Sequence, residues 1–194
     1  MKPAFNNLRI LRVLSFTAPL LITTSLRAAT VEVSETAMVV QHVTVSSSKA
    51  YPAVIADIES NLAKLDDRFR QLAKEKRTDE LQADLQKAAG KYGLMIHYTG
   101  AFTTWLAALK GVQKRGTEYF TGNILTAVEM TNQHMGAGLY APLRIIVYEN
   151  AQGGTTIEYD KPSTLLSQYH SAAIDVQGRS LDERLARLCN AVLQ

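Results

Sequence analysis

Apolar and polar residues alternate near the start of the folded part of the chain. Between Val31 and Ser46, β-branched residues dominate, and two sets of residues follow a period of two: Val39, Gln41, Val43 and Val45, and between them Val40, His42 and Thr44. This period, with β-branched side chains, is typical of a strand. We therefore expect the first strand in this segment, ended by the serines at 46–48.

The next apolar residues follow a helical period. They recur at steps of three and four, at Val54, Ile55, Ile58, Leu62, Leu65, Phe69 and Leu72. Such a stripe predicts one long helix with this face on the core, and Pro52 is well placed in its first turn. After it, Thr78 is predicted to cap a shorter helix that Gly90 and Gly93 close.

The second half of the chain reads mainly as strands. We expect strands at residues 94–98, 117–121, 143–149 and 155–159, the last two joined by a glycine-containing turn at 150–154. Gly122 leads into a helix from Ile124 to His134, which Gly136 and Gly138 stop. The segment from Gly100 to Gly111 is less regular. Its apolar residues Phe102, Trp105, Leu106 and Leu109 have helical spacing, which indicates an irregular or short helical crossover.

Two further helices are expected near the C-terminus. Pro162 opens a short helix or turn. Ser180 and Glu183 have the spacing of a capping box, so the last helix is predicted to begin there, with Leu181, Leu185, Leu188 and Val192 on its apolar face. The order of elements predicts an α+β fold in one domain, residues 37–194. An antiparallel sheet would carry its long helices on one face and leave the other face as a possible ligand groove.

The N-terminal residues have the pattern of an export signal. A basic stretch that ends at Arg12 is followed by a mostly apolar run from Val13 to Leu26 and by small residues at Ala28 and Ala29. Residues 1–29 are therefore predicted to be a signal peptide and residues 30–36 a short linker, which makes the protein periplasmic or secreted. Two alternatives stay open, an uncleaved N-terminal anchor and a true start at Met38.

Charge and cysteine content narrow the classes of partner. The chain has 21 basic and 18 acidic residues, and four of the cations, Lys2, Arg9, Arg12 and Arg27, lie in the first 28 residues. The remainder, with 17 basic residues, has a net charge of −1. It is expected to attract neither nucleic acid nor, once the signal is removed, a membrane. The single cysteine, Cys189, can form no internal disulfide and is expected to be buried.

A set of short motifs resembles the bacterial family called domain of unknown function 302. The motifs are Tyr119–Asn123, Thr126–Met130, the "GLYAPLR" strand at Gly138–Arg144, and Tyr159–Ser163. The resemblance extends over about residues 37–193 and implies an α+β domain with a TATA-binding-protein-like arrangement of sheet and helices. It implies no shared activity. This chain has Ile124 where the family usually has proline, and its loop at residues 99–101 lacks the acidic–histidine pair of many relatives.

Four residues of this block are candidates for a ligand groove: Tyr119, Asn123, Arg144 and Tyr148. Asn123 precedes a helix, where free N–H groups can hold an anion, although its side chain can also cap them itself. Arg144 offers a fork of donors to an anion, unless it pairs with Glu129 or Asp160. Tyrosines have apolar bodies and polar tips that suit a pocket, but they also pack in ordinary sheets.

Three functions follow from these residues. The first is a non-enzymatic, exported module that binds a small ligand, for which an anion is the candidate, and needs no cofactor. The second is a metal- or haem-associated protein that uses Met130 and His134, which are four residues apart on one predicted helix. The third is a structural or assembly protein that pairs through a sheet edge, for example as a homodimer.

Overall fold

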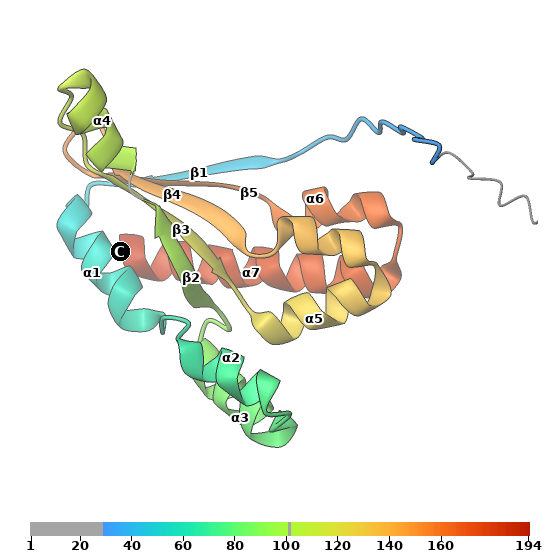
Figure 1. The fold of residues 1–194 in the computed structure, drawn as a ribbon. Coiled ribbons are helices and arrows are strands. Elements are labelled where there is room, and N and C mark those ends of the chain that lie inside the picture. Colours follow the sequence, from blue (N-terminus) through green and yellow to red (C-terminus); the bar gives the residue numbers. More distant parts are fainter. Residues whose placement is uncertain (1–28, 101) are drawn as a thin grey trace, which may run out of the picture. The chain divides into compact units, whose positions relative to one another are not determined.

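A computed structural model describes residues 29–100 and 102–194, and residues 37–194 form one compact unit. The predicted signal peptide lies outside the described residues, apart from Ala29. Figure 1 shows the fold of this unit as a ribbon.

The centre of the unit is one antiparallel sheet of five strands. They are β1 (His42–Ser47), β2 (Met95–Gly100), β3 (Gly116–Gly122), β4 (Leu143–Glu149) and β5 (Thr155–Asp160). Their order is β1-β5-β4-β3-β2, so the first strand of the sequence pairs with the last. All four pairings are antiparallel, which confirms the predicted sheet.

The described helices are α1 (Tyr51–Asn61), α2 (Asp67–Lys74), α3 (Thr78–Ala89), α4 (Phe102–Lys110), α5 (Ile124–Gln133), α6 (Pro162–Leu166) and α7 (Ala172–Leu193), with short 3₁₀ helices η1 (Met135–Tyr140) and η2 (Ser167–Tyr169). Helices α1 and α7 pack on one face of the sheet, whereas α4 stands at the end of the strands and borders a hollow with Ile146 and Tyr148 of the other face. Figure 1 shows α7 running behind the strands, with α1 beside it. The predicted α+β class is confirmed. In the described part of the chain, no helix has the length and apolar character that crossing a bilayer requires.

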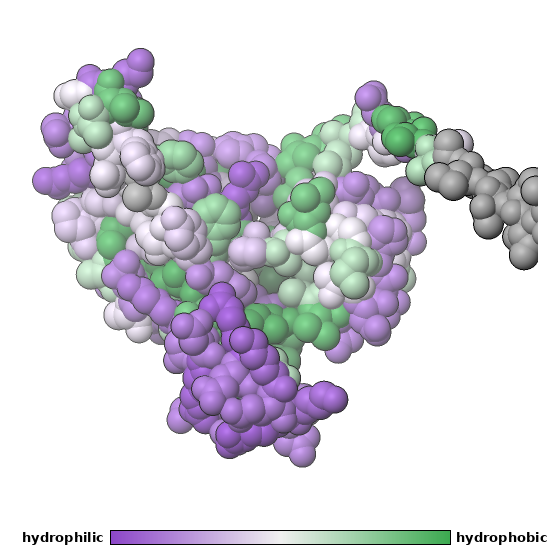
Figure 2. All heavy atoms as spheres, viewed as in Figure 1, coloured by the Kyte–Doolittle hydropathy of each residue, from purple (hydrophilic) through white to green (hydrophobic). Residues whose placement is uncertain are grey.

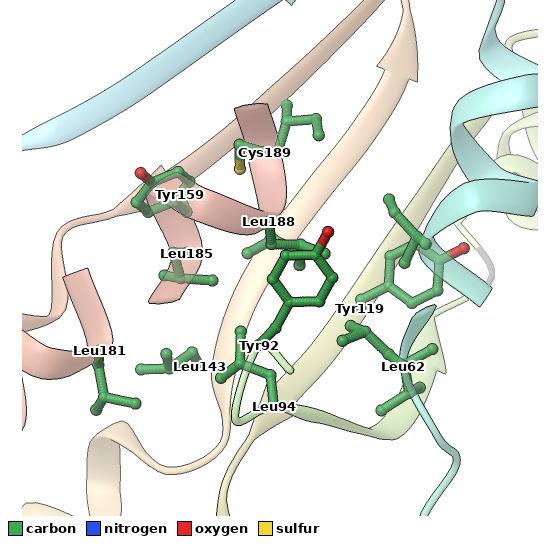
Figure 3. Packing of buried hydrophobic residues seen from close by; sticks show 14 of the residues in the cluster. Leu62, Tyr92, Leu94, Tyr119, Leu143, Tyr159, Leu181, Leu185, Leu188 and Cys189 are labelled. Atoms are coloured by element: carbon green, nitrogen blue, oxygen red, sulfur yellow. The ribbon is translucent and has the colours of Figure 1, made fainter. Parts of the chain in front are cut away.

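The core lies between α7 and the helix-facing side of the sheet. Leu185, Leu188 and Cys189 of α7 are buried, as are Ile145 and Ile157 of the central strands. Figure 3 shows the α7 side chains pointing toward Leu143, Tyr159 and the side chains of neighbouring segments. Burial of each large aliphatic side chain stabilises the fold by about 1.5–3 kcal/mol. Burial raises the pKa of the Cys189 thiol to about 12.

The prediction of one helix from Pro52 to Leu72 is wrong. The chain leaves α1 at Leu62 because residues 63–65 pair with the outer edge of β2: the Ile96 amide donates to Ala63 O at 2.9 Å, and the Leu65 amide donates to Ile96 O at 2.8 Å. The Asp66 side chain then caps α2 by accepting from the Arg68 amide at 2.9 Å. Apolar spacing alone could not reveal this pairing between distant segments.

The predicted start of the last helix at Ser180 is also wrong. Helix α7 begins at Ala172, and Ser171 is its N-cap. Ser180 lies inside the helix, and the Asp182 side chain accepts a hydrogen bond from the Ser163 amide of α6 at 2.9 Å. A Cβ at Gly178 would lie 3.0 Å from Ser163 Cα, so the glycine permits this close packing of α6.

Smaller differences concern the ends of other elements. Strand β1 begins at His42, later than the alternating pattern at Val39 suggests. Thr78 is the first residue of α3, and no side chain caps that helix. Gly136 and Gly138 lie in η1, because α5 already ends at Gln133.

Candidate functional site

The face of the sheet opposite α1 and α7 carries a set of mostly polar and aromatic side chains. We call it the open face; it comprises Tyr98, Glu118, Phe120, Arg144, Ile146, Tyr148, Thr156, Glu158, Asp160, His42, Thr44 and Ser46. The alternation is clearest on β4, where Leu143, Ile145 and Val147 are buried and the residues between them are not. The period of two along each strand therefore separates the core from this surface.

A chain of hydrogen bonds crosses three strands of the open face. The Tyr148 hydroxyl donates to Glu158. The other oxygen of Glu158 lies 3.1 Å from His42 Nε2, and His42 Nδ1 lies 2.9 Å from Asp160 Oδ1. Both ring nitrogens thus face a carboxylate, an arrangement that suits the doubly protonated imidazolium.

The pKa values along this chain shift as the contacts require. Hydrogen bonds to Asp160 and then to Glu158 raise the pKa of His42. The hydrogen bond from Tyr148, with a further one from His42, lowers the pKa of Glu158. The same contact with Glu158 raises the pKa of Tyr148. At neutral pH the chain therefore favours ionised Glu158 and protonated Tyr148.

Arg144 is exposed in the middle of the open face, next to Phe120 of β3. It borders a hollow of about 540 Å³, lined on its apolar side by Phe120, Leu139, Tyr140 and Leu165. It also borders a smaller hollow of about 150 Å³ that contains Glu118, Glu158 and His42. Among the described residues Arg144 forms no ion pair, and Asp160, one of its two predicted partners, is bound by His42.

The structure divides the four predicted ligand-binding residues. Arg144 and Tyr148 share the open face, about 13 Å apart along β4 at the usual rise per strand residue. Tyr119 is fully buried on the helix-facing side, and its hydroxyl donates to Glu59 at 3.4 Å. Burial, together with Glu59, raises the pKa of Tyr119. Tyr119 therefore cannot contact a ligand that Arg144 holds.

Asn123 is occupied at the start of α5. Its Oδ1 accepts from the Thr126 amide at 3.1 Å, and its Nδ2 donates to Gly93 O at 3.0 Å. This is the capping role that the sequence left open as an alternative to anion binding. Asn123 also borders a narrow pocket of about 100 Å³, together with His97 and Met130. The pKa of His97 is lowered because the ring is partly buried.

The predicted metal pair is not aligned on one helical face. Met130 is buried on α5, whereas His134 lies just beyond the helix with an extended backbone. The His134 Nδ1 accepts from the Gly136 amide at 3.1 Å, and its ring lies 4.6 Å from the ring of Tyr169. Within residues 29–100 and 102–194, no cluster of three or more His, Cys, Asp or Glu side chains could hold a metal ion.

Sequence reasoning missed two members of the open face that surround Arg144, His42 and Glu158, and it named Asp160 only as a possible ion-pair partner of Arg144. The sequence of β5 does contain an indication, because Glu158 and Asp160 alternate with Ile157 and Tyr159, which are buried. The pairing of β1 with β5, which brings His42 to these carboxylates, joins residues 118 positions apart and leaves no local trace.

Comparison with known proteins agrees with this architecture. The sequence model of the family described as "Domain of unknown function DUF302" matches residues 69–192, from α2 to α7. The crystal structure of an uncharacterized conserved DUF302 protein from Bacillus stearothermophilus superposes with a TM-score of 0.55 at 20% identity, over 79% of this chain and 98% of that one. This likeness shows the fold. No curated protein matches the chain.

Proposed function

We propose that this chain, which belongs to the DUF302 family, is an exported protein that binds a small ligand through an anionic group held by Arg144. The observation that carries the proposal is the state of this arginine. Its guanidinium group is exposed beside two hollows and forms no ion pair within the described residues. A planar fork of five donors binds a carboxylate or phosphate with good geometry.

The surroundings of Arg144 indicate the rest of the ligand. The hollow of about 540 Å³ is within the usual size of a small-molecule site. Its wall is mostly apolar, with Phe120, Leu139, Tyr140 and Leu165. A ligand with one anionic group and an apolar body fits this combination better than a bare inorganic anion.

The nearby carboxylates limit how strongly an anion can bind. Glu118, Glu158 and Asp160 border the smaller hollow with Arg144, and His42 is the second basic group there. Protonation of His42 reduces the negative charge of this cluster. Because the pKa of His42 is raised, we expect ligand affinity to increase as the pH falls through the titration of His42.

The proposal contains no chemical step. On the open face both ring nitrogens of His42 are hydrogen-bonded to carboxylates, and Tyr148 is bonded to Glu158. These contacts hold the polar groups in place and leave Arg144 as the donor for a ligand. Saturable binding without turnover is the expected behaviour.

Binding can be tested with benzoate, hexanoate, phenyl phosphate and inorganic phosphate as probes in isothermal titration calorimetry. Arg144→Gln should weaken the best probe by about 10- to 100-fold, the loss expected for a charge-assisted hydrogen bond of about 1.5–3 kcal/mol. Arg179→Gln is the matched control, since Arg179 is also exposed but lies on α7. No binding of any probe, or equal affinities in both variants, would contradict the proposal.

Export needs a separate test, because it rests on the pattern of residues 1–29. We propose cleavage near Ala28 or Ala29. The denatured mass of the protein recovered from a bacterial periplasmic extract should lack roughly 28 residues. A full-length mass in the cytoplasmic fraction would contradict export and leave the ligand proposal untouched.

A further inference from the structure

Helix α4 presents its large apolar side chains to solvent. Phe102, Trp105, Leu106 and Leu109 are 57%, 62%, 37% and 75% exposed. Their spacing places all four on one stripe of the helix, about 100° wide, of the kind that normally faces a core. The less exposed positions are the small residues Thr103 and Ala107. The amphipathic helix is therefore turned with its apolar stripe outward.

The chain that follows this stripe is basic. Lys110, Lys114 and Arg115 are exposed, and no acidic residue occurs between Tyr98 and Thr117. Arg115 has a long contact of 3.4 Å with Glu149. Lys110 and Lys114 form no ion pair within the part of the chain that the structure describes. We call α4 together with residues 111–115 the α4 patch.

The α4 patch is accessible to a flat surface. In Figure 1 α4 stands at the end of the strands, away from α2, α3, α5 and α6. Figure 2 shows hydrophobic and hydrophilic atoms side by side at this point of the surface. The patch also lies at the far end of β4 from Arg144, beside a hollow that contains Tyr148.

We propose that the α4 patch docks on the surface of an anionic lipid bilayer, with α4 lying in the interface. Trp, Phe and Leu on one side and Lys or Arg beside them are the composition of helices that bind there. The chain without its first 28 residues has a net charge of −1, which by itself predicts no membrane partner. The charges are unevenly distributed, however, and three cations, Lys110, Lys114 and Arg115, lie in the α4 patch. A two-fold dimer through the same patch would place Lys110 and Lys114 against similar charges, which disfavours a second copy as the occupant.

The chain contains a built-in probe for this proposal. Trp105 is its single tryptophan. The full chain should be titrated with vesicles of phosphatidylglycerol and phosphatidylcholine, mixed equally, and with vesicles of phosphatidylcholine alone. We expect a blue shift of Trp105 emission, and quenching by brominated lipid, with the anionic vesicles and much less with the neutral ones. The predicted signal segment contains no tryptophan, so its own binding would not produce this change.

Variants of the α4 patch separate its apolar and charged contributions. Leu109→Ser should lower the partition coefficient about tenfold. The pair Lys110→Gln and Lys114→Gln should lower it by about fivefold per charge. The controls are Val128→Ser, at a valine that is 55% exposed on α5, and the pair Lys74→Gln and Lys87→Gln on α2 and α3. Both should bind like the wild type.

Several results would overturn the proposal. One is unchanged Trp105 emission with anionic vesicles, and another is an equal shift with neutral vesicles. A third is equal loss in the patch variants and their controls. If sedimentation equilibrium without lipid shows a dimer whose formation shifts Trp105 emission, the patch joins two copies instead. None of these measurements depends on a ligand at Arg144, so the two proposals fail independently.

Discussion

Gly154, at the start of β5, provides a sharp test of how the first strand joins the sheet. An added Cβ there would lie 2.1 Å from the carbonyl oxygen of Ser47 and 2.9 Å from Ser48 Cα. Both are backbone atoms at the end of β1, where Ser47 pairs with Thr155. In Gly154→Ala, β1 must therefore move by about 1 Å or give up part of its pairing.

The magnitude follows from this geometry and from the neighbouring glycine. Overpacking against atoms that cannot turn away costs about 1–3 kcal/mol, and we expect the upper end, about 3 kcal/mol, because the clash is with backbone. Gly153 is the matched control: its φ of +78° strains an alanine, but an added Cβ would have nothing within 4 Å. Gly153→Ala should cost about 1 kcal/mol.

Thermal unfolding followed by far-ultraviolet circular dichroism measures the difference. At about 2–4 °C per kcal/mol for a domain of this size, thermal midpoints should fall by about 6–12 °C for Gly154→Ala and about 2–4 °C for Gly153→Ala. If Gly154→Ala is no less stable than Gly153→Ala, then β1 does not lie against the start of β5 as described.

Three further outcomes are expected. Asn123→Ala should reduce the free energy of unfolding by about 1–2 kcal/mol in urea denaturation, because the Thr126 amide loses its cap; a loss below 0.5 kcal/mol, on the order of a neutral surface change, would contradict the capping role. The pKa of His42, measured by NMR, should exceed 6.5, and Asp160→Asn should lower it, since Asp160 is the main cause of the shift. The contact stabilises the fold at pH values below the pKa of His42 in the unfolded chain. This stabilisation is lost as the pH rises through the pKa of His42 in the folded protein. Cys189 should not react with a thiol reagent at pH 8 until the protein is unfolded in guanidinium, because burial raises its pKa to about 12; rapid labelling of the native protein would refute the core placement.

The sequence was informative wherever one period governed a segment. The strands at β4 and β5 and the helix α5 follow from local alternation and from Gly122, and the structure has them within a residue or two. It failed where a distant segment decided the outcome. Residues 63–65 leave the helical stripe to pair with β2, and α7 starts eight residues before the capping box, with α6 packed against Gly178 and Asp182.

The sequence predicted only part of the candidate site, because contacts between distant segments decide the rest. Arg144 and Tyr148 share one parity on β4, so a single strand is enough to place them together. Tyr119 lies on β3, where one face carries Thr117, Tyr119 and Thr121 and the other carries Glu118 and Phe120. The composition of the two sets is too similar to predict which of them faces the core. His42 reaches the site only through the β1–β5 pairing.

That pairing also sets the order in which the protein can fold during synthesis. Asp160 follows His42 by 118 residues, so at 5–20 residues per second the partner strand of β1 emerges roughly 6–24 s later. The strand pairs β2–β3 and β4–β5 need no such wait, since each joins strands that are consecutive in sequence. For this interval β1 is a β-branched segment without a partner, and such segments are the ones that nascent chains must keep from pairing wrongly. Long-range closure of this kind also predicts slow folding relative to helical domains of equal size.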